Sequence, residues 1–153
     1  KGGGKPLLLK LSPDNSDDEI IASAQMALRK GVDGFVATNT TLHRPVPRNA
    51  TSRGVFAESG GLSGRPLQER SNEVIRLLYE EAQSTVPIVG VGGIDSVDTA
   101  WQAVSSGASL LQLYSALVFN GPSVVSCIVK GLRKRVKENG FLGIEEAVGL
   151  DIT

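Results

Sequence analysis

The sequence predicts an α/β fold, and specifically about four βα units of a (β/α)8 barrel. Four short apolar segments recur along the 153 residues, and a segment with helical periodicity follows each of them. Strands that alternate with helices are typical of a parallel sheet with right-handed crossovers. Small polar residues or glycines also stand at the end of every apolar segment. Because a whole barrel of this kind typically takes about 250 residues, the chain is long enough for roughly half of one.

The first βα unit is predicted at the N-terminal end. The apolar run PLLLKLSP (6–13) is expected to form a strand. Ser16 and Glu19 then have the spacing of a capping box, which predicts that a helix begins there. Gly31 supplies a C-terminal stop for this helix. The apolar residues that share one face of it are Ile20, Ala24, Ala27 and Leu28.

The second unit has a longer connection. The run GFVATNT (34–40) predicts a strand, and the polar segment HRPVPRNATSRGVFAE (43–58) follows it. A loop of this length in a barrel is expected to be a lid, and a disordered segment is the alternative. Pro66 is expected near the start of the next helix. The buried stripe of that helix is predicted to contain Val74, Ile75 and Leu78.

The last two units follow the same pattern. Strands are predicted at VPIVGVGG (86–93) and SLLQLYSA (109–116). Asp95 is expected to cap the third helix, which should end at Gly107, and the fourth helix should end near Gly140. The apolar residues of the third helix are Ala100, Trp101 and Val104. Those of the fourth are Val125, Ile128, Val129, Leu132 and Val136.

Composition narrows the function classes. Hydrophobic residues make up 41% of the chain and aromatic residues 5%, which predicts an aliphatic core around buried parallel strands. Sixteen basic residues balance sixteen acidic ones, so the net charge gives no reason to expect nucleic acid or an anionic membrane as a partner. Cys127 is the single cysteine, which excludes a disulfide framework and a cysteine-rich metal site. We predict no metal site, and we expect Cys127 in the core.

The sequence contains no apolar run long enough for a membrane span and no signal peptide. It lacks an initiator Met and opens on KGGGKP, directly before a predicted strand. We therefore expect the chain to be a fragment or a processed part of a longer protein.

Two architectures agree with the order of elements. A doubly wound sheet would need helices on both of its faces, whereas a barrel has them only outside. The residues at the strand ends favour the barrel. In a (β/α)8 barrel the active site gathers at the carboxyl ends of the strands, with phosphate bound after the last two.

Polar side chains at the first two strand ends are candidates for ligand binding. Lys10 lies among leucines, where it either faces a ligand or extends its charge to water from an edge strand. Thr38, Asn39 and Thr40 end the second strand. The asparagine amide offers both a donor and an acceptor, which suits a flat heterocycle or a carboxylate. The alternative is a turn closed by these side chains.

Glycine-rich segments stand beside the later strands. The segments SGGLSG (59–64) and GVGG (90–93) present backbone N–H groups without side-chain obstruction, each just before a predicted helix. Such turns can hold a phosphate, although each alone could equally be a tight βα turn. Tyr114 and Ser115 end the last predicted strand. In a barrel these three places would converge on one point, which strengthens the phosphate interpretation.

Taken in order, these strand ends resemble those of the dihydroorotate dehydrogenase family, and specifically its class 2 branch, which is quinone-dependent and membrane-associated. The matching stretches are KLSPD (10–14), TNTTLHRP (38–45), GGLSGRPL (60–67), PIVGVGGIDS (87–96), GASLLQLYSALVFNGP (107–122) and GFLGIEEAVG (140–149). The resemblance covers almost the whole chain.

The resemblance implies an FMN-containing barrel that oxidises dihydroorotate to orotate in pyrimidine biosynthesis, with quinone as the electron acceptor. By the same resemblance, Lys10 and Thr38 contact the flavin, whereas Asn39 and Thr40 hydrogen-bond the substrate ring. The phosphate cradle is implied at Ser63, Gly64, Gly92, Gly93, Tyr114 and Ser115. A wall of the quinone tunnel is implied at Tyr114, Leu117 and Pro122.

The resemblance also places residues 1–153 in the C-terminal half of the catalytic barrel. The catalytic serine base of the family belongs to the other half, so the chain alone is expected to be inactive and to need that half as its partner. The implied location is peripheral, at the mitochondrial or bacterial inner membrane. The alternatives are another FMN- or phosphate-binding barrel, oxidoreductase or isomerase, and a non-catalytic half-barrel that acts as a binding module.

Overall fold

The computed structural model describes residues 4–46, 54 and 56–152. Its sheet has four parallel strands, and each strand pairs with the one that precedes it along the chain. The strands are β1 (Leu8–Leu11), β2 (Gly34–Ala37), β3 (Ile88–Gly90) and β4 (Leu110–Leu111). This sequential order is that of a barrel wall, because a doubly wound sheet reverses its strand order at a switch point. The predicted parallel sheet is confirmed, with strands shorter than the apolar runs.

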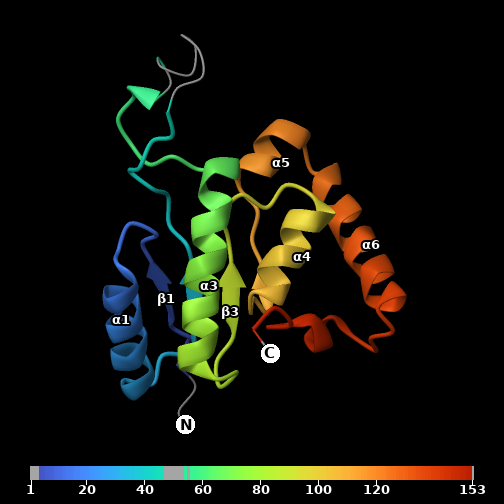
Figure 1. Cartoon of the computed structure of the whole chain (residues 1–153), viewed down its shortest axis with the longest axis horizontal. Coiled ribbons are helices and arrows are strands. Elements are labelled where there is room, and N and C mark those ends of the chain that lie inside the picture. The colour runs from blue at the N-terminus through green and yellow to red at the C-terminus, as the bar shows by residue number, and fades with distance from the viewer. Residues whose placement is uncertain (1–3, 47–53, 55, 153) are drawn as a thin grey trace.

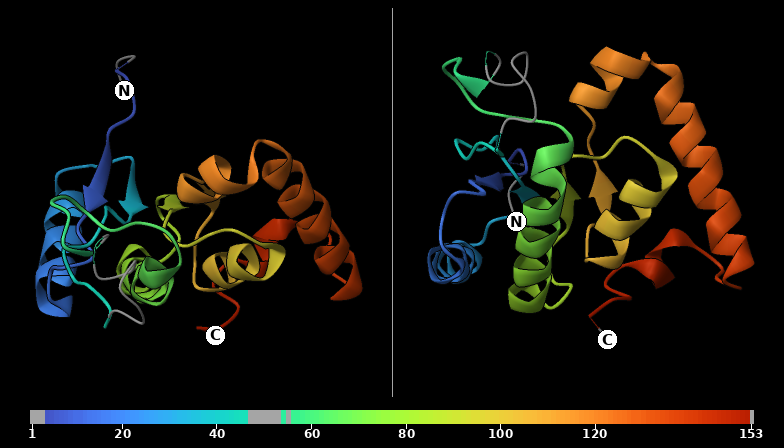
Figure 2. Two further views of the ribbon diagram at one scale, coloured as in Figure 1. Left: turned by 90° about the horizontal axis from the view of Figure 1, so that it is seen from above. Right: turned by 45° about the horizontal axis from the view of Figure 1, so that its top comes forward.

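The long helices line the sheet. They are α1 (Asp17–Arg29), α3 (Gln68–Ala82), α4 (Val97–Ser105) and α6 (Ser123–Glu138). Seen from above, α1, α3 and α4 follow one another along the same side of the strands, and α6 packs against α4 (Figures 1 and 2). Short turns of 3-10 helix precede α3 and follow α6, at η1 (Arg65–Leu67) and η2 (Ile144–Ala147). A short helix, α5 (Ser115–Asn120), follows β4.

The two faces of the sheet differ in burial. Leu9, Phe35 and Ile88 are neighbours across β1, β2 and β3, and they belong to the core that the helices cover. The next row along the strands joins Lys10, Val36, Val89 and Leu110. Lys10 is exposed, and Leu110 is 58% exposed. The helices therefore cover one face of the sheet and leave open the other, which in a barrel faces the interior.

Local signals in the sequence explain where α1 begins and ends. The Ser16 hydroxyl accepts from the Glu19 backbone N–H at 3.3 Å, and the Glu19 carboxylate accepts from the Ser16 backbone N–H at 2.9 Å. This confirms the predicted capping box. Ile20 and Ala24 are fully buried on the predicted stripe. Gly31 follows the helix with φ +78°, a conformation that favours glycine.

The cap of α4 differs from the prediction. Ser96, rather than Asp95, is the N-cap, and its hydroxyl accepts from the Thr99 backbone N–H at 3.3 Å. The backbone of Ser96 is extended, so its side-chain oxygen points at the first turn of the helix. The free N–H groups there are therefore capped by Ser96, one residue after the predicted Asp95. The Asp95 side chain does not cap the helix and instead contacts Arg65 of η1.

The buried face of α6 also differs. The residues facing the core are Val124, Ile128 and Val136, while Val125 and Val129 are each 44% exposed and Cys127 is exposed. The helix approaches α4 through Gly131, where a Cβ atom would collide with Val97. Because Cys127 is exposed, the prediction that it lies in the core is wrong.

Half of the loop predicted as a lid or a disordered segment (43–58), namely 47–53 and 55, lies outside the described residues. Within the part of the chain that the structure describes, no helix combines the length and apolar character needed to cross a bilayer.

Candidate functional site

A cleft of about 750 Å³ opens at the carboxyl ends of the four strands. In Figure 1 this is the end of the sheet where α5 lies. Every residue predicted to contact cofactor or substrate lines the cleft: Lys10, Thr38, Asn39, Thr40, Ser63, Gly64, Gly92, Gly93, Tyr114 and Ser115. Leu117 and Pro122, assigned to the quinone tunnel, do not line it. The four strand ends thus meet at one place, as the barrel prediction requires.

The β1 and β2 ends supply the polar floor of the cleft. Lys10 lies on the open face of the sheet, beside Val36. Thr38 is 2% exposed, and its hydroxyl shares a 2.9 Å hydrogen bond with the Ser71 hydroxyl on α3. Its backbone N–H donates to the Val91 carbonyl at 2.7 Å. Asn39 and Thr40 are exposed in the cleft, with side chains available to a ligand.

Close packing explains the glycines after β3. A Cβ atom on Gly93, where φ is +70°, would lie only 2.8 Å from the Gln68 Cα atom at the start of α3. One on Gly92 would collide with the Ser71 hydroxyl. Gly64, with φ +85°, faces Ser115 across the cleft. These turns need glycine both for their backbone conformation and for the room they leave.

A serine pair joins the first glycine-rich segment to the first residue of α5. The Ser63 and Ser115 hydroxyls are 2.7 Å apart, and either one can donate. Each hydroxyl also keeps hydrogen-bonding capacity for a ligand in the cleft. The backbone turns at Gly64 and Gly93 therefore reach the cleft together with two hydroxyls, a set of donors suited to a phosphate.

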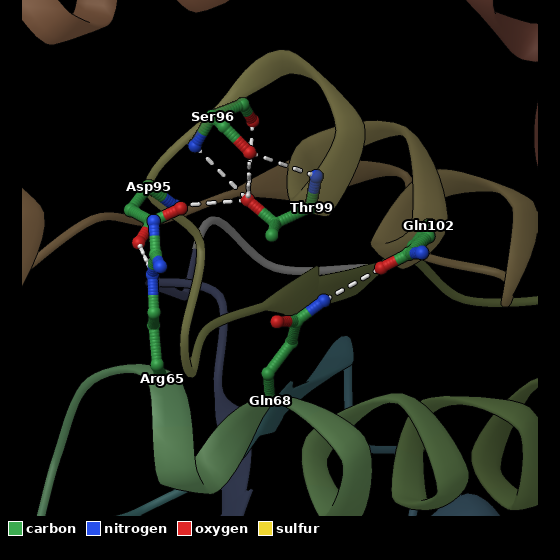
Figure 3. Close-up of polar contacts among 6 residues, drawn as sticks. All are labelled: Arg65, Gln68, Asp95, Ser96, Thr99 and Gln102. Carbon is green, nitrogen blue, oxygen red and sulfur yellow. Dashed lines mark hydrogen bonds and ion pairs between the residues drawn. The ribbon is translucent and has the colours of Figure 1, made fainter.

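Further polar contacts tie the start of α3 to the start of α4 (Figure 3). The Arg65 guanidinium donates to the Asp95 carboxylate at 2.5 Å, and the Gln68 amide donates to the Gln102 amide oxygen at 2.6 Å. The Asp95 backbone N–H donates to the Thr99 hydroxyl at 2.9 Å, and this bond holds the Asp95 backbone against the first turn of α4. The hydrogen bond to Asp95 and its negative charge raise the pKa of Arg65. The two glycine turns are thus joined by an ion pair at the rim of the cleft.

The sequence analysis missed three members of this site. Ser71 holds Thr38 and is 1% exposed, Arg65 pairs with Asp95, and Asp14 anchors the segment after Thr40. A signal exists only for Ser71, because it lies three residues before Val74 on the buried stripe of α3. A serine at such a position needs a polar partner. No group of three metal-ligating side chains occurs among the described residues.

Comparison with known proteins identifies the family. The family model for dihydroorotate dehydrogenase matches residues 3–136. Among curated relatives, a dihydroorotate dehydrogenase (quinone) from Trichodesmium erythraeum is 41% identical over 150 residues, covering 95% of this chain and 40% of the relative. Another so named, from Synechococcus elongatus, is 44% identical over 153 residues, covering 95% of this chain and 39% of the relative.

Solved structures give the same answer. The ligand-free dihydroorotate dehydrogenase of Eimeria tenella superimposes with a TM-score of 0.86 at 34% identity, covering 95% of this chain and 39% of that one. Its complex with ferulenol gives a TM-score of 0.87 at 33% identity, covering 99% and 40%. These neighbours are (β/α)8 barrels, and this chain spans about 40% of their length. From its sequence and its fold alike, the chain belongs to the dihydroorotate dehydrogenase family.

Proposed function

We propose that residues 1–153 form the C-terminal part of the barrel of a quinone-dependent dihydroorotate dehydrogenase, which oxidises dihydroorotate to orotate in pyrimidine biosynthesis. The observation that carries this proposal is the convergence of four strand ends on one cleft, with all the candidate cofactor and substrate residues at its wall. The names of the curated relatives support the choice of substrate and of quinone as acceptor.

The cleft fits FMN in size and in chemistry. Its volume of about 750 Å³ is within the usual range for cofactor sites. Gly64 and Gly93 both line the cleft, and the protein atoms nearest to the place of a Cβ atom on Gly64 are 3.7 Å away, on Ser115. Ser63 and Ser115 add hydroxyl donors. In this proposal the phosphate binds between these turns.

Lys10 and Thr38 would meet the flavin ring at the other end of the cleft. The FMN group supplies the redox chemistry, as an acceptor of hydride from dihydroorotate and a donor of electrons to quinone. Lys10 provides a positive charge on the open face of the sheet, where it stabilises negative charge on the ring. Thr38 is held by Ser71 and has little freedom to move.

Asn39 and Thr40 would bind the substrate. Their side chains line the cleft beside Lys10, and the amide of Asn39 can both donate to and accept from the alternating N–H and C=O groups of dihydroorotate. The base that removes a proton from the substrate is assigned to the remainder of the barrel rather than to a serine of this chain.

The remainder of the barrel is therefore the proposed partner. Leu8 on β1 is 39% exposed and Leu110 on β4 is 58% exposed, so both outer strands present apolar surface to it. The exposed apolar residues of α5, Leu117, Val118 and Phe119, support the proposed quinone access. The last part of the proposal is the location of the whole protein, which we place at the surface of the mitochondrial or bacterial inner membrane, where quinone is found.

A chimera tests it, with this chain replacing the matching segment of the Synechococcus elongatus relative. We expect the purified chimera to contain FMN, and its flavin absorbance to bleach when dihydroorotate is added without oxygen. Bound FMN that does not bleach would point to another flavin-dependent barrel enzyme. A folded chimera without FMN would support a non-catalytic binding module instead.

A further inference from the structure

Asp14 lies just beyond β1 and binds the segment that follows Thr40. One oxygen of its carboxylate accepts from the Thr41 hydroxyl, and the other accepts from the Leu42 backbone N–H at 2.7 Å. The Thr41 hydroxyl in turn accepts from the His43 backbone N–H at 2.9 Å. Thr41 is only 7% exposed, so its hydroxyl lies largely inside the protein, whereas Leu42 is 72% exposed and its bond to Asp14 is open to water.

Thr41 also connects β2 to the glycine-rich segment. Its backbone N–H donates to the Leu62 carbonyl at 3.1 Å, and its carbonyl accepts from the Leu62 N–H at 2.7 Å. Arg44 donates to the carbonyls of Thr41, at 3.0 Å, and of Gly60, at 2.5 Å. The residue next to the proposed substrate pair is therefore bonded to Leu62, which lines the cleft, and to Asp14 and Arg44, which lie outside its lining.

The Asp14 backbone is itself held in place by α3. Arg70 donates to the carbonyls on either side of Asp14, to Pro13 at 3.0 Å and to Asn15 at 2.9 Å. Arg70 also forms ion pairs with Asp17 and with Glu73. Asp14 therefore binds Thr41 from a backbone that Arg70 holds on both sides.

We propose that Asp14 is a positioning residue that sets the orientation of Asn39 and Thr40 toward the substrate. The inference rests on the proposed function, because it assigns the substrate to these two side chains. Asp14 itself lies outside the lining of the cleft. Its effect is exerted through Thr41, which follows Thr40 directly in the chain.

Kinetics of the chimera test the inference. Asp14→Asn removes the negative charge and leaves one acceptor oxygen in place of two, so the Thr41 hydroxyl and the Leu42 N–H can no longer both donate to a carboxylate and the charge-assisted bonds are weakened. We expect KM for dihydroorotate to rise about tenfold, with kcat changed less than about twofold and FMN content unchanged. Thr41→Val should behave in the same way, and Thr41→Ser should restore the parent KM. Asp18→Asn, at an exposed carboxylate in the first turn of α1, is the matched control.

Hydrogen exchange tests the inference without relying on activity. In the same variants we expect the amides of residues 39–42 to exchange about tenfold faster in Asp14→Asn than in Asp18→Asn. An unchanged KM together with unchanged exchange would overturn the positioning role. Loss of FMN together with the rise in KM would also overturn it, because Asp14 would then support the whole cleft. A parent chimera that binds FMN without oxidising dihydroorotate would reject the proposed function, whereas the exchange result would still decide what Asp14 does.

Discussion

Single residues in this cleft act mainly through the space they leave and the partners they hold. Gly93 illustrates the first and Thr38 the second. A side chain on Gly93 has no room beside the start of α3, and Thr38 is bound to Ser71 in the interior. The sequence predicted both positions from their place at a strand end. The buried stripe of α3 signals that Ser71 needs a polar partner, but the sequence could not identify Thr38 as that partner, because the two are 33 positions apart and meet only through the packing of α3 on β2.

Gly93→Ala is expected to destabilise the protein and to expel FMN. The new Cβ atom would meet the backbone of Gln68, so the turn must shift, and its backbone N–H groups, proposed to bind phosphate, shift with it. We expect a loss of about 2 kcal/mol or more in the free energy of unfolding, measured by urea denaturation of the chimera. Gly121→Ala is the control, because Gly121 has the same φ of +70° with nothing within 4 Å of the new atom. Equal effects at the two sites would mean that backbone strain, rather than the collision, is responsible.

Asp14 gives a pH dependence with a definite sign. Burial raises the pKa of Asp14, but hydrogen bonds from Thr41 and Leu42, with the charges of His43 and Arg44, outweigh this and lower the pKa below 3.8. The contribution of the ionised carboxylate to stability is therefore present above about pH 4, and is lost as the pH falls through the folded-state pKa. We expect the loss of unfolding free energy between pH 6 and pH 3 to be smaller in Asp14→Asn than in Asp18→Asn. Equal losses would contradict this assignment.

At the scale of elements, the sequence predicted the order of strands and helices better than which of their residues are buried. Hydrophobic periodicity and the Ser16 capping box are local signals, and both are confirmed for α1. The exposed side of α6 is not a local property. Which apolar residues of that helix are buried depends on where α4 touches it, and hydrophobic periodicity does not specify that contact.

The cap of α4 provides a test at this scale. Ser96→Ala removes the acceptor for the Thr99 N–H, and we expect it to lower the free energy of unfolding by about 1 kcal/mol. Ser123→Ala, at the first residue of α6, should have almost no effect, since Pro122 occupies that N-cap and the Ser123 hydroxyl makes only a 3.5 Å contact with the Asn120 carbonyl. Chemical denaturation of both variants measures the difference. A larger effect at Ser123 would show that the caps have been assigned wrongly.

The Arg65–Asp95 pair connects elements, but its own contribution to stability is expected to be small. The Arg65 side chain is 80% exposed, and ion pairs at such positions add little to stability. We expect Arg65→Ala to leave the free energy of unfolding almost unchanged and to weaken FMN retention more clearly, because it leaves the Asp95 carboxylate unpaired at the rim of the proposed phosphate site. Titration of FMN against the apo-chimera, at low and high salt, measures this effect. If Arg65→Ala left the affinity for FMN unchanged at low salt, the Arg65–Asp95 pair would have no role in FMN binding.

At the scale of the whole molecule, the convergence of the strand ends was predictable because it follows from topology alone. Parallel strands in sequential order bring their carboxyl ends to one edge, whatever the side chains. The contacts that hold the site together were not predictable. Thr41 and Asp14 are 27 residues apart, and Arg65 and Asp95 are 30 residues apart. Such pairs depend on the distances between packed helices and loops, which sequence periodicity does not specify.

The last prediction concerns the open face of the sheet. It tests whether this face is the inside of a barrel or the surface of a sheet exposed to water. Leu110 shares its row with Lys10, Val36 and Val89, on the face that the helices leave uncovered. In a closed barrel this row lies inside, so Leu110→Asp should bury an unpaired carboxylate in the chimera and lower its free energy of unfolding by at least about 3 kcal/mol.

The same substitution in the chain alone should have little effect, because Leu110 is already 58% exposed there. Leu142→Asp is the matched control, since Leu142 is 96% exposed and lies beyond α6, and it should be neutral in both proteins. Thermal melts of the four variants, each compared with its parent, measure the contrast. If Leu110→Asp were tolerated equally well in the chimera, the uncovered face of this sheet could not be the interior of a barrel. The cleft would then be an open surface rather than half of an enclosed flavin site.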